Sequence, residues 1–219
     1  MLLVALSVGT TTLFADPTPT DLNASLNVNG GGSGAPSCGS TGCSFGTVNV
    51  HQSGTNTVDV TVTMSAGYFI DTGVHNSFTF NINGVAITIS DIVGYNASNV
   101  AASPGAFVQG TGGTDNPPFG TFDYALDTTL CSGANCSTQL TKLTFTVTGS
   151  GLTVADFEKL SDAGAYFAAD IYSNVNGKTG AVAATGYTTS TVPEPTSLLL
   201  LGTGLIGGSA SLRRKFRRG

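Results

Sequence analysis

A two-residue alternation of apolar and small polar side chains is the feature that most restricts the fold of this chain. Residues 58–64 read Val-Asp-Val-Thr-Val-Thr-Met, and residues 143–148 read Leu-Thr-Phe-Thr-Val-Thr. Successive side chains of a β-strand point to opposite faces, so this period predicts strands with one buried and one solvated face. Threonine fills most of the polar positions and occurs 32 times in the chain, which argues against a helical bundle.

Turn signals divide the alternating segments into hairpins. Two pairs of segments flank an Asn-Gly dipeptide, a strong short hairpin signal: residues 78–82 with 85–89, and residues 166–172 with 181–188. We expect a further strand at residues 119–126 and one short helix at residues 153–160, where Thr153 caps the first turn. Short hairpin-linked strands with one helical turn predict an all-β fold, an antiparallel β-sandwich of the jelly-roll or immunoglobulin-like kind, at residues 47–190.

The N-terminal end has two parts that differ from this domain. Residues 1–15 run from an apolar Leu-Leu-Val-Ala-Leu stretch to Leu-Phe-Ala. This order is typical of a secretory signal peptide that is cleaved after Ala15, and a buried N-terminal strand is the alternative. Residues 16–46 are rich in Pro, Gly, Ser and Asn and predict a loop that leads into the domain.

The C-terminal end predicts a single transmembrane helix. Residues 196–212 carry no charge, and a helix of this length spans about 25 Å, close to the ~30 Å of a hydrocarbon core. Basic residues that follow an apolar helix stay on the cytoplasmic side and stop transfer, so the large domain lies outside the cytoplasm. The basic residues that form this stop are Arg213, Arg214, Lys215, Arg217 and Arg218.

The order of three features near the C-terminus identifies a sorting signal. Pro193-Glu194-Pro195, the Leu/Gly-rich segment and the basic cluster follow one another and together resemble the PEP-CTERM sorting signal at residues 191–219. The resemblance implies a protein of a Gram-negative-type bacterium that is exported and anchored for a time in the inner membrane. It further implies cleavage near Pro193–Pro195 by exosortase, a membrane-embedded cysteine transpeptidase-like enzyme, and then a place at the cell surface or outside the cell. A single-pass anchor that is never cut is the alternative.

Four cysteines form two similar pairs, Cys38 with Cys43 and Cys131 with Cys136. In an exported protein an even number of cysteines predicts disulfides, and we expect Cys38–Cys43 and Cys131–Cys136. The two other connectivities and a zinc site of four thiolates are alternatives. Short loops of this kind stiffen local turns more than they stabilise the whole fold.

The residues that carry catalysis in known motifs are few. The chain has two histidines, His51 and His75, without H-E-x-x-H spacing, and it has no G-x-S-x-G sequence. We therefore expect no catalytic residues and no metal or other cofactor. Eleven aspartates could ligate calcium, although no calcium-loop motif is present.

Two functional hypotheses follow. Residues 16–194 carry a net charge of −10, which argues against a nucleic-acid partner. The first hypothesis is a non-enzymatic surface or matrix protein that is retained among extracellular polysaccharides, as in a biofilm. The second is a secreted carbohydrate-binding module or weak glycan-active enzyme, for which Tyr68, Tyr95 and Tyr124 are the candidate ligand-binding residues because tryptophan is absent. A concave, tyrosine-lined face favours the second hypothesis, and a flat threonine surface favours the first.

Overall fold

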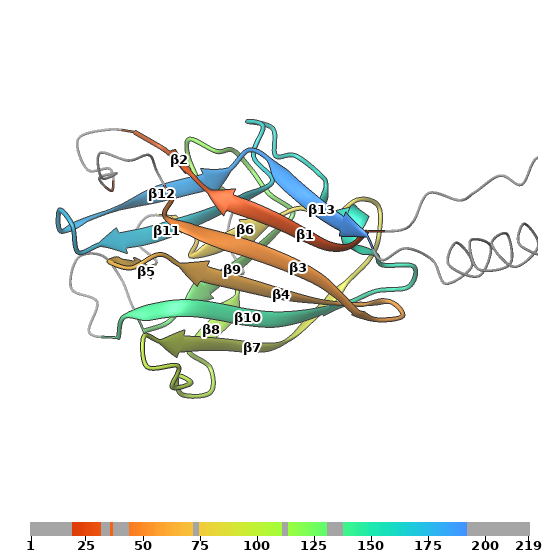
Figure 1. Cartoon of the computed structure of the whole chain (residues 1–219), viewed down its shortest axis with the longest axis horizontal. Helices are drawn as coiled ribbons and strands as arrows, with labels where there is room; N and C mark the ends of the chain where they lie inside the picture. Colours follow the sequence, from red (N-terminus) through yellow and green to blue (C-terminus); the bar gives the residue numbers. More distant parts are fainter. Residues whose placement is uncertain are drawn as a thin grey trace, which may run out of the picture. The chain divides into compact units, whose positions relative to one another are not determined.

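The computed structural model describes residues 19–31, 36, 44–71, 75–110, 114–130 and 138–191 (Figure 1). Within them, residues 19–190 form one compact unit that is built from strands and one 3-10 turn, η2 (Val154–Phe157). The strand pairs are antiparallel, so the all-β, antiparallel prediction is confirmed. In chain order the strands are β1 (Pro19–Leu26), β2 (Val28–Asn29), β3 (Gly46–Gly54), β4 (Thr57–Met64), β5 (Tyr68–Ile70), β6 (Phe78–Phe80), β7 (Thr88–Asn96), β8 (Phe107–Gln109), β9 (Tyr124–Thr128), β10 (Leu140–Thr148), β11 (Phe167–Ser173), β12 (Lys178–Ala184) and β13 (Tyr187–Thr191).

The strands form one continuous sheet with two halves. The first half runs in the order β13-β1-β3-β4-β10, with β7 on the other side of β10. The second half is centred on β11, which pairs with β12 and β6, while β9 and β8 follow β6. Strand β5 joins the halves, because Ile70 pairs with Leu140 of β10 and with Ile171 of β11. The jelly-roll or immunoglobulin-like topology that the sequence suggests stays a prediction.

The apolar faces of the two halves pack against each other. Phe145 of β10 lies with its ring centroid 6.0 Å from that of Phe78 and 5.5 Å from that of Phe80, both on β6. Phe80 also stacks on Phe157 of η2 at 5.8 Å. These rings are almost completely buried and form the centre of the core, where aromatic side chains contribute large buried areas.

The predicted hairpin at Asn83-Gly84 is wrong. Strand β6 pairs with β9 and β11, whereas β7 pairs with β10, so the chain passes between the halves at this point instead of turning back. The Asp123 carboxylate accepts the backbone N–H of Ile82 at 3.0 Å, and the N–H of Asn83 is donated to the carbonyl of Asp156 at 2.8 Å. These bonds from distant segments take the donors that a hairpin ladder would have used.

The second Asn-Gly dipeptide does connect two paired strands. Strands β11 and β12 are antiparallel neighbours, with Ser173 opposite Lys178, and Gly177 adopts a φ of 67° in the turn. The predicted helix at residues 153–160 is shorter than expected, a single 3-10 turn. Its start is as predicted, because the Asp156 carboxylate accepts the backbone N–H of Thr153 at 2.8 Å.

Part of the segment predicted as a loop, residues 16–46, is a strand of the sheet, next to its end. Strand β1 lies in it and pairs with β3 over six residues, from Asp21 opposite His51 to Leu26 opposite Gly46. Its side chains alternate, with Leu22, Ala24 and Leu26 buried. The sequence contains this signal, an Asp-Leu-Asn-Ala-Ser-Leu alternation, but the surrounding glycine, proline and serine residues obscure it.

Candidate functional site

The outer side of the first half of the sheet is a broad polar surface. Strands β1, β3, β4 and β10 alternate over most of their length, so that their apolar residues enter the core and their polar residues face outward. We name the following outward residues the polar face: Asp21, Asn23, Ser25, Thr47, Asn49, His51, Asp59, Thr61, Thr63, Lys142, Thr144 and Thr146. Most of these side chains are uncharged hydrogen-bonding groups, so the surface suits a polar, neutral partner.

Cross-strand pairs order the polar face into rows. In one row Asp21 stands opposite His51, and His51 stands opposite Asp59 of the next strand. Asp59 in turn accepts a hydrogen bond from the Thr146 hydroxyl at 2.8 Å. In the neighbouring row the Asn49 amide donates to Oδ1 of Asn23 at 3.0 Å. Such bonds restrict the positions of the side chains that form them.

The histidine of the polar face forms a hydrogen bond with an aspartate at the edge of this face. His51 Nδ1 lies 2.8 Å from Asp21 Oδ1, and both side chains are partly exposed. The hydrogen bond from His51 is the main reason that the pKa of Asp21 is below its usual value, and the hydroxyls of Ser190 and Thr20 lower it further. The Ser190 hydroxyl donates to Asp21 Oδ2 at 3.2 Å. Because the carboxylate lies between serine and histidine, this order does not activate the serine as a nucleophile.

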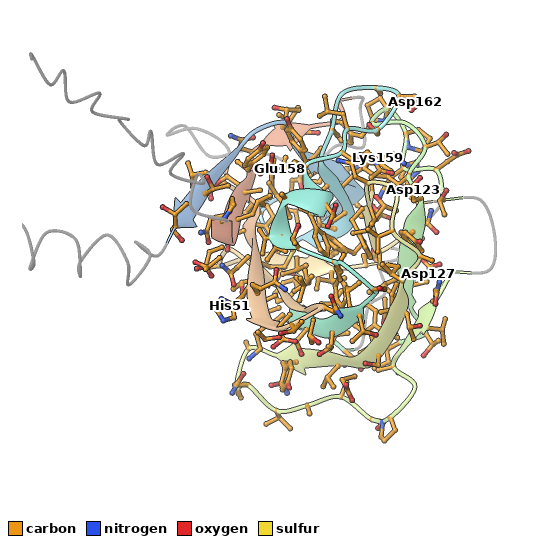
Figure 2. The ribbon with its side chains drawn as sticks, turned by 90° about the vertical axis from the view of Figure 1, so that its right-hand side faces the viewer. His51, Asp123, Asp127, Glu158, Lys159 and Asp162 are labelled. Atoms are coloured by element: carbon orange, nitrogen blue, oxygen red, sulfur yellow. The ribbon has the colours of Figure 1, made fainter. Side chains whose placement is uncertain are left out.

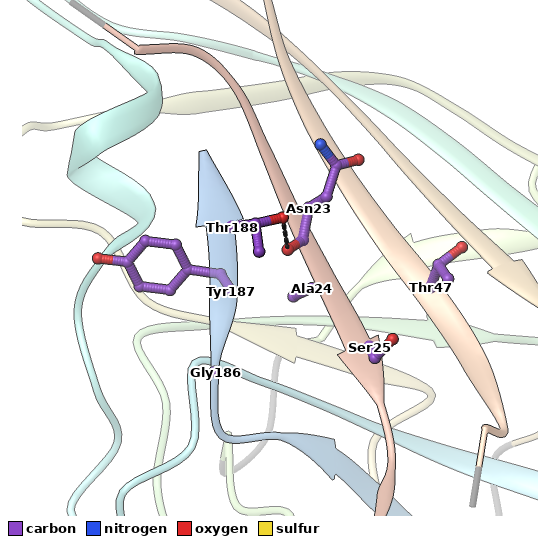
Figure 3. Close-up of a pocket in the computed structure, with 7 residues that line it drawn as sticks. All are labelled: Asn23, Ala24, Ser25, Thr47, Gly186, Tyr187 and Thr188. Atoms are coloured by element: carbon purple, nitrogen blue, oxygen red, sulfur yellow. Dashed lines mark hydrogen bonds between the residues drawn. The ribbon is translucent and has the colours of Figure 1, made fainter. Parts of the chain in front are cut away.

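A groove of about 370 Å³ lies where β13 meets β1 (Figure 3). It is formed where β12 and β13 are joined by Thr185 and Gly186, which carry the chain from the second half of the sheet to the first. The Thr188 hydroxyl donates across it to the carbonyl of Asn23 at 3.5 Å. The groove is lined by Asn23, Ala24, Ser25, Thr47, Gly186, Tyr187 and Thr188. The sequence did not predict this groove, because residues 16–46, which include β1, were expected to form a loop.

Tyr187 is the first residue of β13, and its side chain packs against the rest of the unit. Its ring packs edge-on against Tyr166, with the centroids 4.8 Å apart and an interplanar angle of 89°. Its hydroxyl forms a hydrogen bond with Glu158, and this bond, burial and nearby charge raise the pKa of Tyr187 to about 12. The phenol therefore keeps its proton at neutral pH and can donate a hydrogen bond that connects β13 to the segment after η2.

Two carboxylates away from the polar face, Asp123 and Asp127, bind other groups of the folded unit (Figure 2). Asp123 forms an ion pair with Lys159 at 2.7 Å and also accepts the N–H of Ile82. Asp127 accepts the N–H of Ser77 at 3.1 Å, and burial raises the pKa of this carboxyl. Figure 2 places His51 far from the Asp123–Lys159 pair, so these titratable groups do not converge on one site.

The three candidate tyrosines lie on three different strands, and each contacts another side chain. Tyr68 of β5 is only 8% exposed and packs edge-on against Phe45 at 5.2 Å. Tyr124 of β9 stacks on Phe80 of the core at 5.4 Å. Tyr95 of β7 carries the Lys142 ammonium 4.0 Å above its ring. The structure thus does not join them into one platform, and Tyr187, which was not predicted, lines the groove instead.

Several predicted sites lie outside the described residues. These are the signal peptide at residues 1–15, both cysteine pairs, the Pro193-Glu194-Pro195 motif and the basic cluster at residues 213–218. The predicted transmembrane segment, residues 196–212, lies outside them as well, and the described part of the chain contains no helix long and apolar enough to cross a bilayer. Among the same residues, no three His, Cys, Asp or Glu side chains are grouped as a metal site would require.

Comparison with known proteins identifies the end of the chain. The family model for the PEP-CTERM protein-sorting motif matches residues 191–215. No curated protein and no solved structure matches the chain. The chain therefore carries a PEP-CTERM sorting motif, as its sequence predicts, and this motif implies an exported protein that an exosortase sorts to the cell surface.

Proposed function

We propose that this protein is a non-enzymatic component of the cell surface or extracellular matrix. It is anchored for a time in the inner membrane, cut near Pro193–Pro195 and retained among extracellular polysaccharides. The observation that carries this proposal is the sorting motif at residues 191–215, which begins at the last residue of β13. A folded unit that is attached directly to such a motif is the part that processing would deliver outside the membrane.

The polar face supports a binding role more than a catalytic one. Its hydroxyl and amide groups are held in rows by cross-strand bonds, and they offer many weak hydrogen bonds to a neutral polymer. His51 is engaged in a hydrogen bond with Asp21, and Asp123 in an ion pair with Lys159, both within the unit. A surface of this kind favours retention in a hydrated polysaccharide layer over turnover of a substrate.

Intact-mass measurement of the protein from exosortase-containing cells tests the proposal. We expect a species that lacks the first ~15 residues, as for a signal peptide, and also lacks the C-terminal segment that follows the cut. Replacement of Pro193, Glu194 and Pro195 by alanine is expected to preserve the C-terminal segment, and a strain without exosortase is the matched control. A full-length protein that stays in the cytoplasm would overturn the proposal.

The groove beside β13 supports a second function, binding of a short neutral glycan. A tyrosine ring together with amide and hydroxyl groups is the chemistry that sugar sites use, and Tyr187, Asn23 and Ser25 bring these groups to one groove. A glycan-array screen of the folded unit tests this. We expect any bound glycan to be lost in Tyr187→Ala but kept in Tyr172→Ala, which alters a tyrosine outside the groove.

A further inference from the structure

We infer that β13 is a release strand, which separates from β1 so that the exosortase can take up residues 188–191 in extended form. This inference rests on the proposed function, because it assigns to the folded unit a part in its own processing. It concerns residues 188–191, the last of which is the first residue matched by the sorting motif.

Very little chain separates β13 from Pro193, near which the cut is expected. The strand ends at Thr191, and Val192 is the one residue between it and Pro193. An extended segment is bound through its backbone groups as well as its side chains. An enzyme that cuts near Pro193 and binds extended chain before the bond would contact Ser190 and Thr191, and one backbone edge of this strand is already occupied by its pairing with β1.

The attachment of β13 is suited to such a release. It is the terminal strand of the first half of the sheet, and residues 188–191 are all exposed. The side-chain bonds that join it to β1 are long or exposed: Ser190 to Asp21 at 3.2 Å, Thr20 to the Ser190 carbonyl at 3.4 Å, and Thr188 to the Asn23 carbonyl at 3.5 Å. Segments with few buried contacts open at low free-energy cost.

Tyr187 defines where the release stops. Its ring contact with Tyr166 and its bond to Glu158 hold the first residue of β13 to the unit. The residues after it lack apolar side chains that enter the core. Separation is therefore expected to begin at the C-terminal end of the strand and to end at Tyr187, so the core stays folded during the cut.

A reversible cross-link between the strands tests the inference. In the full-length precursor we replace Asp21 and Ser190 by cysteine, since their side chains meet across the two strands. Cleavage is followed in membranes that contain the exosortase, with the oxidised and the reduced precursor compared. We expect the oxidised form to be cut at less than about a tenth of the reduced rate, because only a precursor whose β1 and β13 have separated can be cleaved. Wild-type precursor with and without reductant controls for the native cysteines.

A spacer provides the second measurement. Insertion of Gly-Ser-Gly-Ser between Thr191 and Val192 supplies extended chain without separation of β13, so it is expected to restore cleavage of the oxidised precursor. Equal cleavage of the oxidised and reduced forms, with wild type cut normally, would overturn the release-strand inference alone. A cross-linked precursor that stays uncut despite the spacer would also overturn it. Failure of the wild-type precursor to be cut would overturn the proposed function and the inference with it.

Discussion

Strands β10 and β13 both belong to the first half of the sheet, but they differ in how many strands they pair with and in how much of them is buried. Strand β10 pairs with β4 over seven residues and with β7 on its other side, and Leu143, Phe145 and Val147 enter the core. Among the described strands, β13 has a neighbour only in β1, at the end of the sheet, and its residues after Tyr187 are exposed. Because stability follows apolar burial more than strand pairing, we expect β10 to be far more resistant to local opening than β13.

The largest effect is expected at the centre of the core. Phe145→Ala removes a ring that contacts Phe78 and Phe80 and leaves a cavity, so we expect a loss of about 3–5 kcal/mol in the free energy of unfolding. Denaturant unfolding of the folded unit measures it. Thr144→Ala, one residue away on the polar face, is the control. Similar losses for the two variants would contradict the assignment of the core to this side of β10.

A close approach between β3 and β4 is expected to give the next largest effect. A Cβ atom at Gly46 would lie 2.5 Å from the carbonyl oxygen of Thr63 and would also collide with Met64 Cε, so Gly46→Ala must push the strands apart. We expect a loss of about 1–3 kcal/mol by denaturant unfolding. Gly54→Ala, whose nearest atom would be at 3.7 Å, is expected to change little. The reverse order would contradict the register of these strands.

The Asp21–His51 pair is expected to make a smaller, pH-dependent contribution. The pKa of Asp21 is below its model-peptide value of 3.8, so its stabilising effect is complete above that value and is lost as the pH falls through the folded pKa. The pair is partly exposed, and we expect at most about 1 kcal/mol. Unfolding free energy measured from pH 7 down to pH 2 should decline less steeply in Asp21→Asn. Parallel curves for wild type and variant would show that the pair adds nothing.

The smallest effect is expected on β13 itself. Thr189 is exposed, so Thr189→Ala should change the free energy of unfolding by no more than about 0.5 kcal/mol. Amide hydrogen exchange of the same protein should show the backbone of residues 188–190 to be less protected than that of residues 143–147. A loss as large as that of the Gly46 variant would show that β13 is an integral strand and would remove the contrast with β10.

Some strands could be predicted from the sequence alone, whereas their partners in the sheet could not. The alternation at residues 58–64 and 143–148 was enough to predict β4, β10 and the side of each that enters the core. The same alternation at residues 78–82 and 85–89 predicted the wrong partner, because Asp123 and Asp156 bind the backbone between them from far along the chain. Burial was also not predictable from residue type, since Tyr68, one of the candidate ligand-binding tyrosines, lies in the core.

The sequence by itself determined that strongly alternating segments such as β4 and β10 form strands, which side of them is buried, and which signal sorts the protein. These properties are local, because they depend on side-chain period and on the order of short motifs within a few residues. Only the tertiary structure decided which strands are neighbours, that β1 and β13 meet at one corner, and that Tyr187 rather than the predicted tyrosines lines the groove there. Those outcomes depend on contacts between residues more than a hundred positions apart, such as Asp21 with Ser190, and no local pattern specifies them.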